Sequence, residues 1–236
     1  MFNFNFYTPT RVVFGKETEY RIGKLVKNVN CKKVLLHYGS GSVIRSGLLG
    51  RIKESLDASG VTYVELGGVV PNPRLSLVRE GIELCRKEGV DFLLAVGGGS
   101  VIDSAKAIGY GLANDGDVWD FYEHTRQASA CLPIGVVLTI AASGSEMSNS
   151  SVITNDETLE KRGYNNDISR PVFAVMNPEI TMTIPDSLRL HRYSDAYHGA
   201  LFHKRRKYGD HRCHCGRSYA HRDHEREDPC GRSRQL

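Results

Sequence analysis

The sequence predicts an α/β fold whose parallel, Rossmann-like sheet binds a nucleotide. Strand patterns alternate with helical patterns over the first 185 residues, and this repetition is typical of parallel strands joined by right-handed crossovers. Small polar residues follow three of the predicted strands, at 39–42, 97–100 and 139–145. Because ligands bind such sheets at the carboxyl ends of the strands, three clusters in register favour a dinucleotide.

The predicted strands are short apolar or β-branched runs bounded by glycine, proline or polar residues. Segment 1–13 contains two strand signals, an alternation of Phe and Asn followed by a β-branched run before Gly15. The other strand signals lie at 33–37, 62–66, 91–96, 134–139, around Ile153 and at 173–176.

The predicted helices have apolar residues at three- and four-residue spacing. A glycine–serine turn leads into one of them, and a stiff Pro71-Asn72-Pro73 loop precedes another. These helices cover residues 17–29, 43–58, 76–88 and about 100–113. Each lies between two predicted strands, as the crossovers of a parallel sheet require.

Segment 93–109 is the most informative part of the chain. An apolar strand runs into the glycines 97–99, which lack a Cβ and let a ligand approach the main chain. Ser100 stands where a helix N-cap is expected, and the helix start offers N–H groups to an anion. Asp103 in the first turn and Lys106 beyond it are expected to form a polar mouth, that is, a polar opening to the ligand site above the apolar face of the helix. Such turns also occur as purely structural turns, and the G-x-G-x-x-G fingerprint is absent.

The composition changes at about Pro185. Residues 186–236 hold seven of the nine His and three of the six Cys, carry a basic excess, and contain no Val, Ile, Met or Trp. A segment this poor in apolar residues cannot offset its ordering entropy by burial. We therefore expect one nucleotide-binding domain over 1–185 and a basic, disordered tail over 186–236.

Cysteine use and hydropathy predict a cytoplasmic protein. Cys31, Cys85 and Cys131 are scattered singly, which is typical of reduced thiols. No run reaches the length of a membrane span, and the first ten residues lack the pattern of a signal peptide. We expect no membrane or nucleic-acid partner, since the tail has no interleaved aromatic residues or DNA-binding motif.

Five ordered motifs carry a family resemblance. They are Tyr38-Gly39-Ser40-Gly41-Ser42, Pro71-Asn72-Pro73, Gly97-Gly98-Gly99-Ser100-x-x-Asp103, Thr139-x-x-x-Ser143-Gly144-Ser145-Glu146 and Asn177-Pro178-Glu179. Together they resemble the iron-containing alcohol dehydrogenases, in particular their NADPH-dependent butanol dehydrogenase and aldehyde reductase branch. The resemblance implies a dehydroquinate synthase-like amino-terminal domain followed by an all-helical metal-binding domain. It also implies a homodimer that interconverts small alcohols and aldehydes with NADP(H) at Fe²⁺ or Zn²⁺.

The resemblance further implies which residues contact the cofactor. The diphosphate and ribose would lie on Gly98, Gly99, Ser100 and Asp103. The adenosine half would be held by Asn72, and the nicotinamide side would be lined by Thr139, Ser143 and Ser148, with Val152 and Lys161 further along the cleft. The alternatives are a solvated loop for Ser143 and Ser148 and a surface charge run for Lys161. His37 and His124 match no family position and are interpreted as ordinary histidines.

The turn after the second strand bears on the choice of cofactor. It contains Gly39, Ser40 and Ser42. NAD-preferring members of the family tend to carry an acid there, whereas Gly39 and Ser40 leave room for a 2′-phosphate. This predicts NADP(H).

The tail departs from the family. Its members hold the metal with an Asp and a His on one helix and two later histidines, and no such pattern follows Pro185. Permitted codons for the tail, read one base forward from Asp186, spell a helical peptide resembling that metal-binding helix. We therefore expect a frameshifted tail and a truncated, inactive chain with no metal or catalytic residue. The alternative is a nucleotide-binding module whose tail binds metal or nucleic acid through Cys213, His214, Cys215, His221, His224 and Cys230.

Overall fold

The structure is a computed structural model that describes residues 7–182. Its centre is a parallel six-stranded sheet with the strand order β1-β8-β5-β4-β2-β3, which confirms the predicted fold class. The strands are β1 (Arg11–Phe14), β2 (Lys33–Gly39), β3 (Thr62–Val69), β4 (Phe92–Gly97), β5 (Ile134–Leu138) and β8 (Phe173–Met176). The edge pair β1 and β8 joins the two ends of the described chain.

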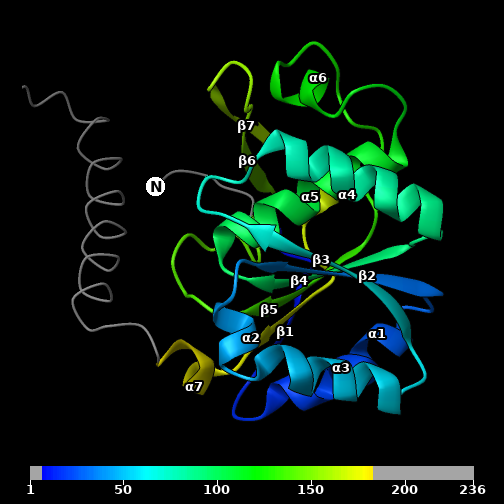
Figure 1. Ribbon diagram of the computed structural model, residues 1–236, viewed down its shortest axis with the longest axis vertical. Helices are drawn as coiled ribbons and strands as arrows, with labels where there is room; N and C mark the ends of the chain where they lie inside the picture. Colours follow the sequence, from blue (N-terminus) through cyan, green and yellow to red (C-terminus); the bar gives the residue numbers. More distant parts are fainter. Residues whose placement is uncertain (1–6, 183–236) are drawn as a thin grey trace, which may run out of the picture. The chain divides into compact units, whose positions relative to one another are not determined.

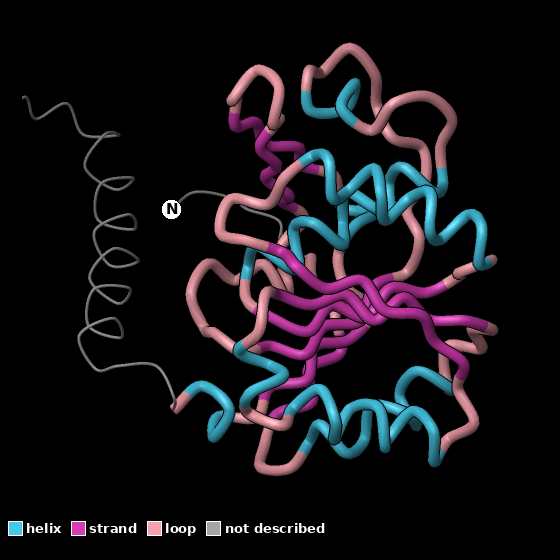
Figure 2. Tube along the Cα trace, viewed as in Figure 1, coloured by secondary structure: helices cyan, strands magenta, loops and turns pink. Residues whose placement is uncertain are grey.

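Helices cover both faces of this sheet (Figure 1; Figure 2 shows the sheet between the two layers). One face carries α1 (Ile22–Lys27), α2 (Ser42–Arg45) and α3 (Leu48–Ala58), and the other carries α4 (Leu75–Glu88) and α5 (Gly99–Ala113). Short elements complete the chain: the 3-10 turns η1 (Thr18–Arg21) and η2 (Asp167–Ser169), and the helices α6 (Trp119–Tyr122) and α7 (Pro178–Thr181).

The central strand β4 divides the interior into two cores. All its residues are buried. Leu93 and Ala95 pack against α4 and α5, whereas Phe92 and Leu94 pack against α1 and α3. Successive strand side chains point to opposite faces, and because both faces are covered the strand is continuously apolar rather than alternating.

Two of the predicted helices are broken in the structure. The helix expected over 17–29 is η1 followed by α1, and the helix expected over 43–58 is α2 followed by α3. The second break falls at Gly47, whose φ of 70° lies in the left-handed region that ends helices. Helical periodicity continues across the break and therefore does not reveal it.

The strand signal around Ile153 belongs to a second sheet. Ile153 lies in β6 (Ser150–Thr154), which pairs antiparallel with β7 (Lys161–Asn165) and takes no part in the parallel sheet. The sequence analysis missed β7, because its Lys-Arg-Gly start lacks an apolar alternation. It also missed α6, a single turn whose aromatic side chains pack on Tyr164.

Several expectations lie outside the described residues. They are the strand signal in residues 1–6, the domain boundary at Pro185, and everything proposed for the tail 186–236. Between residues 7 and 182, no helix has the length and apolar character needed to cross a membrane. The thiols of Cys31, Cys85 and Cys131 are free, as predicted.

Candidate dinucleotide site at the carboxyl ends of three strands

The three polar clusters lie on neighbouring strands. In the sheet β4 is hydrogen-bonded to β2 on one side and to β5 on the other, and all three are parallel. The clusters after them therefore share one edge of the sheet. The chain leaves β2 toward the α2 and α3 face and leaves β4 toward the α5 face. A crevice between two such diverging connections is where open parallel sheets bind ligands.

The start of α5 differs from its prediction. The helix begins at Gly99, Gly98 is its N-cap, and no side chain caps the first turn. Ser100 is thus inside the helix and is not the N-cap, and Asp103 lies beyond the first turn. The glycines allow the helix to begin earlier, so the cap lies two positions before Ser100. A first turn that no side chain caps leaves its N–H groups to an anion.

The glycine turn lies directly beneath the loop after β5. A Cβ on Gly99 would lie 2.9 Å from Ser143 Oγ, and one on Gly98 would lie 3.4 Å from Ile140 Cβ. Thr139 N–H donates to the carbonyl of Gly97 at 3.0 Å. These contacts confirm that the second and third clusters meet.

Asp103 joins α5 to the β5–β6 loop and to β6. Its Oδ1 accepts a hydrogen bond from Ser145 Oγ at 3.1 Å, and its Oδ2 accepts one from Val152 N–H at 3.3 Å. Burial raises the pKa of Asp103 to about 6, although Lys106 and both hydrogen bonds act in the opposite direction. Val152, predicted further along the cleft, is thereby placed beside Asp103.

Lys106 is not part of an open polar mouth. Its side chain is completely buried, and its Nζ donates to the carbonyls of Ser145 at 2.9 Å, Ser148 at 2.8 Å and Ser150 at 2.9 Å. The same Nζ lies 3.3 Å from Ser148 Oγ, so this predicted nicotinamide-side hydroxyl contacts Lys106. Burial lowers the pKa of Lys106 to about 8, and Asp103 partly opposes the effect.

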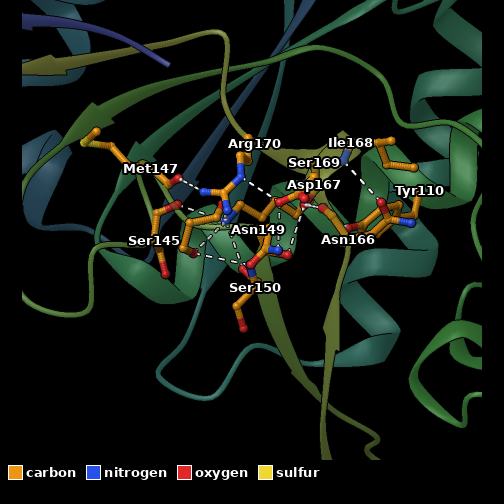
Figure 3. A network of polar contacts seen from close by, with 12 residues as sticks. Tyr110, Ser145, Met147, Asn149, Ser150, Asn166, Asp167, Ile168, Ser169 and Arg170 are labelled. Carbon is orange, nitrogen blue, oxygen red and sulfur yellow. Dashed lines mark hydrogen bonds and ion pairs between the residues drawn. The ribbon is translucent and has the colours of Figure 1, made fainter. Parts of the chain in front are cut away.

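Arg170 also holds this loop (Figure 3). Its guanidinium donates to the carbonyl of Met147 at 2.7 Å and to Asp167 Oδ1 at 2.8 Å. Asp167 Oδ1 also accepts from Asn149 Nδ2 at 2.9 Å. The loop 139–150 is thus fixed largely by side chains from α5 and from the segment after β7.

Asn72, predicted on the adenosine side, contacts Lys161, which was predicted further along the cleft. Lys161 Nζ, at the start of β7, donates to Asn72 Oδ1 at 2.7 Å, and Asn72 has a left-handed φ of 58°. Both side chains are exposed. The contact joins the β3–α4 loop to the β6–β7 hairpin.

The exposure of the remaining predicted residues varies. Ser40, Ser42 and Ser143 are exposed, whereas Gly39, Thr139 and Ser148 are half-buried. His37 is buried between Leu66 and Ser104: its Nδ1 lies 2.8 Å from the Leu66 carbonyl and its Nε2 lies 2.9 Å from Ser104 Oγ. Burial lowers its pKa to about 4, which agrees with the interpretation of His37 as a structural histidine.

The described residues do not fit a metal centre. No group of three or more His, Cys, Asp or Glu side chains in residues 7–182 is arranged to hold a metal ion. The ends of β4 and β5 are compatible with a dinucleotide, because a glycine turn, hydroxyl groups and a helix start that no side chain caps meet there.

Ser145 and Arg170 are structural residues of this site for which the sequence predicted no role, and Lys106 was expected at an open polar mouth rather than inside the fold. The signal for Lys106 was present, since a lysine three positions after Asp103 interrupts an otherwise apolar helix surface. Ser145 stands within the quoted serine–glycine motif. No local sequence pattern indicates that Arg170 binds the β5–β6 loop.

Comparisons with known proteins agree on the family. The model of the iron-containing alcohol dehydrogenases matches residues 9–178. A probable NADH-dependent butanol dehydrogenase 1 of Bacillus subtilis is 48% identical over 185 residues, which are 78% of this chain and 48% of that protein. The NADPH-dependent aldehyde reductase YqhD of Escherichia coli is 36% identical over 188 residues, which are 78% of this chain and 48% of that protein.

Solved structures give the same result. The crystal structure of an NADH-dependent butanol dehydrogenase A from Thermotoga maritima superposes with a TM-score of 0.76 at 44% identity, covering 78% of this chain and 46% of that one. The chain therefore spans about half the length of these relatives. The family match, these identities and the parallel-sheet architecture together show that the chain belongs to the iron-containing alcohol dehydrogenases.

Proposed function

We propose that residues 7–182 form the NADP(H)-binding domain of an oxidoreductase that interconverts small alcohols and aldehydes. The observation that carries the proposal is the Gly98–Gly99 turn, which opens α5 at the point where the connections of β2 and β4 diverge. A diphosphate at this turn would contact backbone N–H groups that no side chain caps.

The other residues follow from their positions around this turn. Ser100 and Asp103 extend the diphosphate and ribose contacts along α5, while Thr139, Ser143 and Ser148 lie in the β5–β6 loop on the opposite side. Val152, which adjoins Asp103, and Lys161 lie further along the cleft, and Asn72, which accepts a hydrogen bond from Lys161, would hold the adenosine half. The bound nicotinamide would supply the hydride chemistry, and the protein positions it.

The preference for NADP(H) rests on the turn after β2. Relatives named for NADH and for NADPH both occur, so the family alone leaves the choice open. A side chain at Gly39 would meet only ordinary contacts, 3.5 Å from the Val69 carbonyl and 3.8 Å from Val101. The protein therefore leaves the space beside Gly39 open for a 2′-phosphate. The guanidinium of Arg45 lies over the neighbouring Gly41 and offers a cation to a 2′-phosphate.

Further properties are proposed for the whole protein. They are a cytoplasmic location, a homodimer, a butanol- or butyraldehyde-like substrate, and an Fe²⁺ or Zn²⁺ ion bound outside the described residues. No step of the reaction is assigned to residues 7–182 beyond binding and orienting the cofactor.

Dinucleotide binding tests the proposal directly. NADPH binding is measured by isothermal titration calorimetry on the full chain and on Gly98→Ala. The apo fold should accept this alanine, because its Cβ would be in ordinary contact with Ile140 and the φ of Gly98 is −92°. It would, however, occupy the space in which a diphosphate approaches the main chain, so we expect binding to weaken about tenfold or more.

The matched control is Gly50→Ala. This glycine lies in α3, and a Cβ there would meet nothing within 4 Å. The affinity of Gly50→Ala for NADPH should equal that of the unmodified chain. An unmodified chain that binds neither NADPH nor NADH, or a Gly98→Ala variant with unchanged affinity, would refute the proposed site.

A further inference from the structure

We infer that Lys106 is an internal cation that folds the loop 139–150 into the shape that receives the nicotinamide half of the dinucleotide, with Arg170 as its partner. The inference rests on the proposed function for the identity of the ligand. It rests on the hydrogen bonds of the loop for everything else.

The backbone of the loop 139–150 finds few hydrogen-bond partners within the loop itself. The chain between β5 and β6 contains a single tight turn, in which the N–H groups of Met147 and Ser148 both donate to the Gly144 carbonyl. The carbonyls of Ser145, Met147 and Ser148 accept instead from Lys106 and Arg170. Two cationic side chains thus take the place of a strand or helix partner.

The contacts of Lys106 are deeply buried and use its whole ammonium group. Lys106 has no exposed surface, and its ammonium donates to three carbonyls drawn from one short stretch, Ser145 to Ser150. An ammonium has three protons, and all three can be used here. Charge-assisted hydrogen bonds are stronger than neutral ones, and a buried ammonium without partners is costly. The loop conformation and the charge therefore stabilise each other.

Hydrogen bonds connect this ammonium to the proposed binding surface. The side chain of Ser145, whose carbonyl binds Lys106, donates to Asp103 and lies 3.2 Å from Ser143 Oγ. Ser143 in turn lies over Gly99. Lys106 is buried and hydrogen-bonds chiefly to loop carbonyls, so it acts as a positioning residue. Without it the loop would populate other conformations, and the apparent affinity for a dinucleotide falls by the fraction of competent loop.

The test removes the ammonium of Lys106 by substitution and then supplies an ammonium as a small molecule in solution. In Lys106→Ala the atoms beyond Cβ are deleted, and n-propylammonium has the same chain length and charge as the deleted group. Exchange of the loop amides is measured by hydrogen–deuterium exchange mass spectrometry without nucleotide, and NADPH affinity by calorimetry. Lys87→Ala, an exposed lysine on α4, is the control variant.

In Lys106→Ala we expect loop exchange about tenfold faster or more, and NADPH affinity weaker by a similar factor. Both should recover with n-propylammonium and not with tetramethylammonium, which carries the charge but no N–H donor. Lys87→Ala should match the unmodified chain. Unchanged loop exchange in Lys106→Ala, or equal effects of the two amines, would overturn the inference.

A second variant covers the case in which Lys106→Ala does not fold. Arg170→Gln removes only the contacts to Met147 and Asp167, and should raise loop exchange while leaving peptides from β4 and β5 protected. Uniform exchange over loop and sheet in that variant, or none beyond the unmodified chain, counts against the inference. A chain that binds no dinucleotide refutes the proposed function instead, and the exchange data still decide the role of Lys106.

Discussion

Two buried groups titrate in the same acidic range with opposite effects on stability. His37 has a pKa of about 4 in the folded chain against 6.5 ordinarily, and Asp103 has a pKa of about 6 against 3.8. Unfolding between pH 6 and 4 therefore takes up a proton at His37 and releases one at Asp103. The stability contributed by His37 falls as the pH decreases from 6.5 to 4, whereas that contributed by Asp103 rises as the pH decreases from 6 to 3.8.

The two effects are similar in size. Each difference in pKa corresponds to about 3 kcal/mol of unfolding free energy, at about 1.4 kcal/mol per pH unit and proton. In the unmodified chain the two slopes cancel between pH 6 and 4. Asp103→Asn should expose the His37 slope and lose about 3 kcal/mol more than the unmodified chain over this range. His37→Asn should deviate by a similar amount in the opposite direction.

Urea denaturation at pH 7, 6, 5 and 4 measures these slopes, with the fluorescence of the buried Trp119, the chain's only tryptophan, as the signal. Other carboxyl groups, such as Glu88 and Asp156, have lowered pKa values and add to the pH dependence of stability, but all variants share them. The double variant should again follow the unmodified chain. Parallel curves for Asp103→Asn and the unmodified chain between pH 6 and 4 would refute the reasoning.

The remaining predictions concern glycines. Gly39→Asp should reverse the proposed preference for NADPH over NADH through repulsion of the 2′-phosphate, whereas the uncharged Gly39→Asn should retain it; equal binding of both dinucleotides by the unmodified chain would contradict this, and calorimetry with each dinucleotide measures it. Gly135→Ala should destabilise the fold by about 1–3 kcal/mol in urea denaturation, because its Cβ would overlap the buried Phe173 ring, which stacks on Phe92. Gly50→Ala should not destabilise, and equal midpoints for the two alanine variants would show that the core at Gly135 can adjust.

Local patterns were sufficient for the parallel sheet and for the place of the site. Continuous apolar runs such as the one in β4 identify buried strands, and the polar residues after them identify one edge of the sheet. The same patterns failed at Gly47, where a left-handed residue divides a helix without changing its periodicity. They also failed at β7, whose pairing with β6 compensates for a sequence with little strand character.

The interior of the site depended on distant contacts. The burial of Lys106 depends on carbonyls about 40 residues further along the chain. The guanidinium of Arg170 binds the carbonyl of Met147, which is 23 positions away. Neither contact has a periodic signal. The N-cap of α5 was misplaced for a different reason, because sequence preference favours Ser100 as a cap, while the structure uses Gly98, two positions earlier.

The pairing of β1 with β8 has a consequence for how the domain is made. Residues 11–14 pair with residues 173–176, far along the chain. The buried Asn177 Nδ2 also donates a hydrogen bond to Glu19 Oε2 at 2.9 Å. A nascent chain leaving the ribosome could form the β2–β3–β4 portion early, but its first strand would have no neighbour until almost the whole described segment had emerged. Such a high sequence separation slows folding and leaves an unpaired edge open to association in the meantime. The segment would thus fold to completion in a late step, after synthesis has passed residue 176.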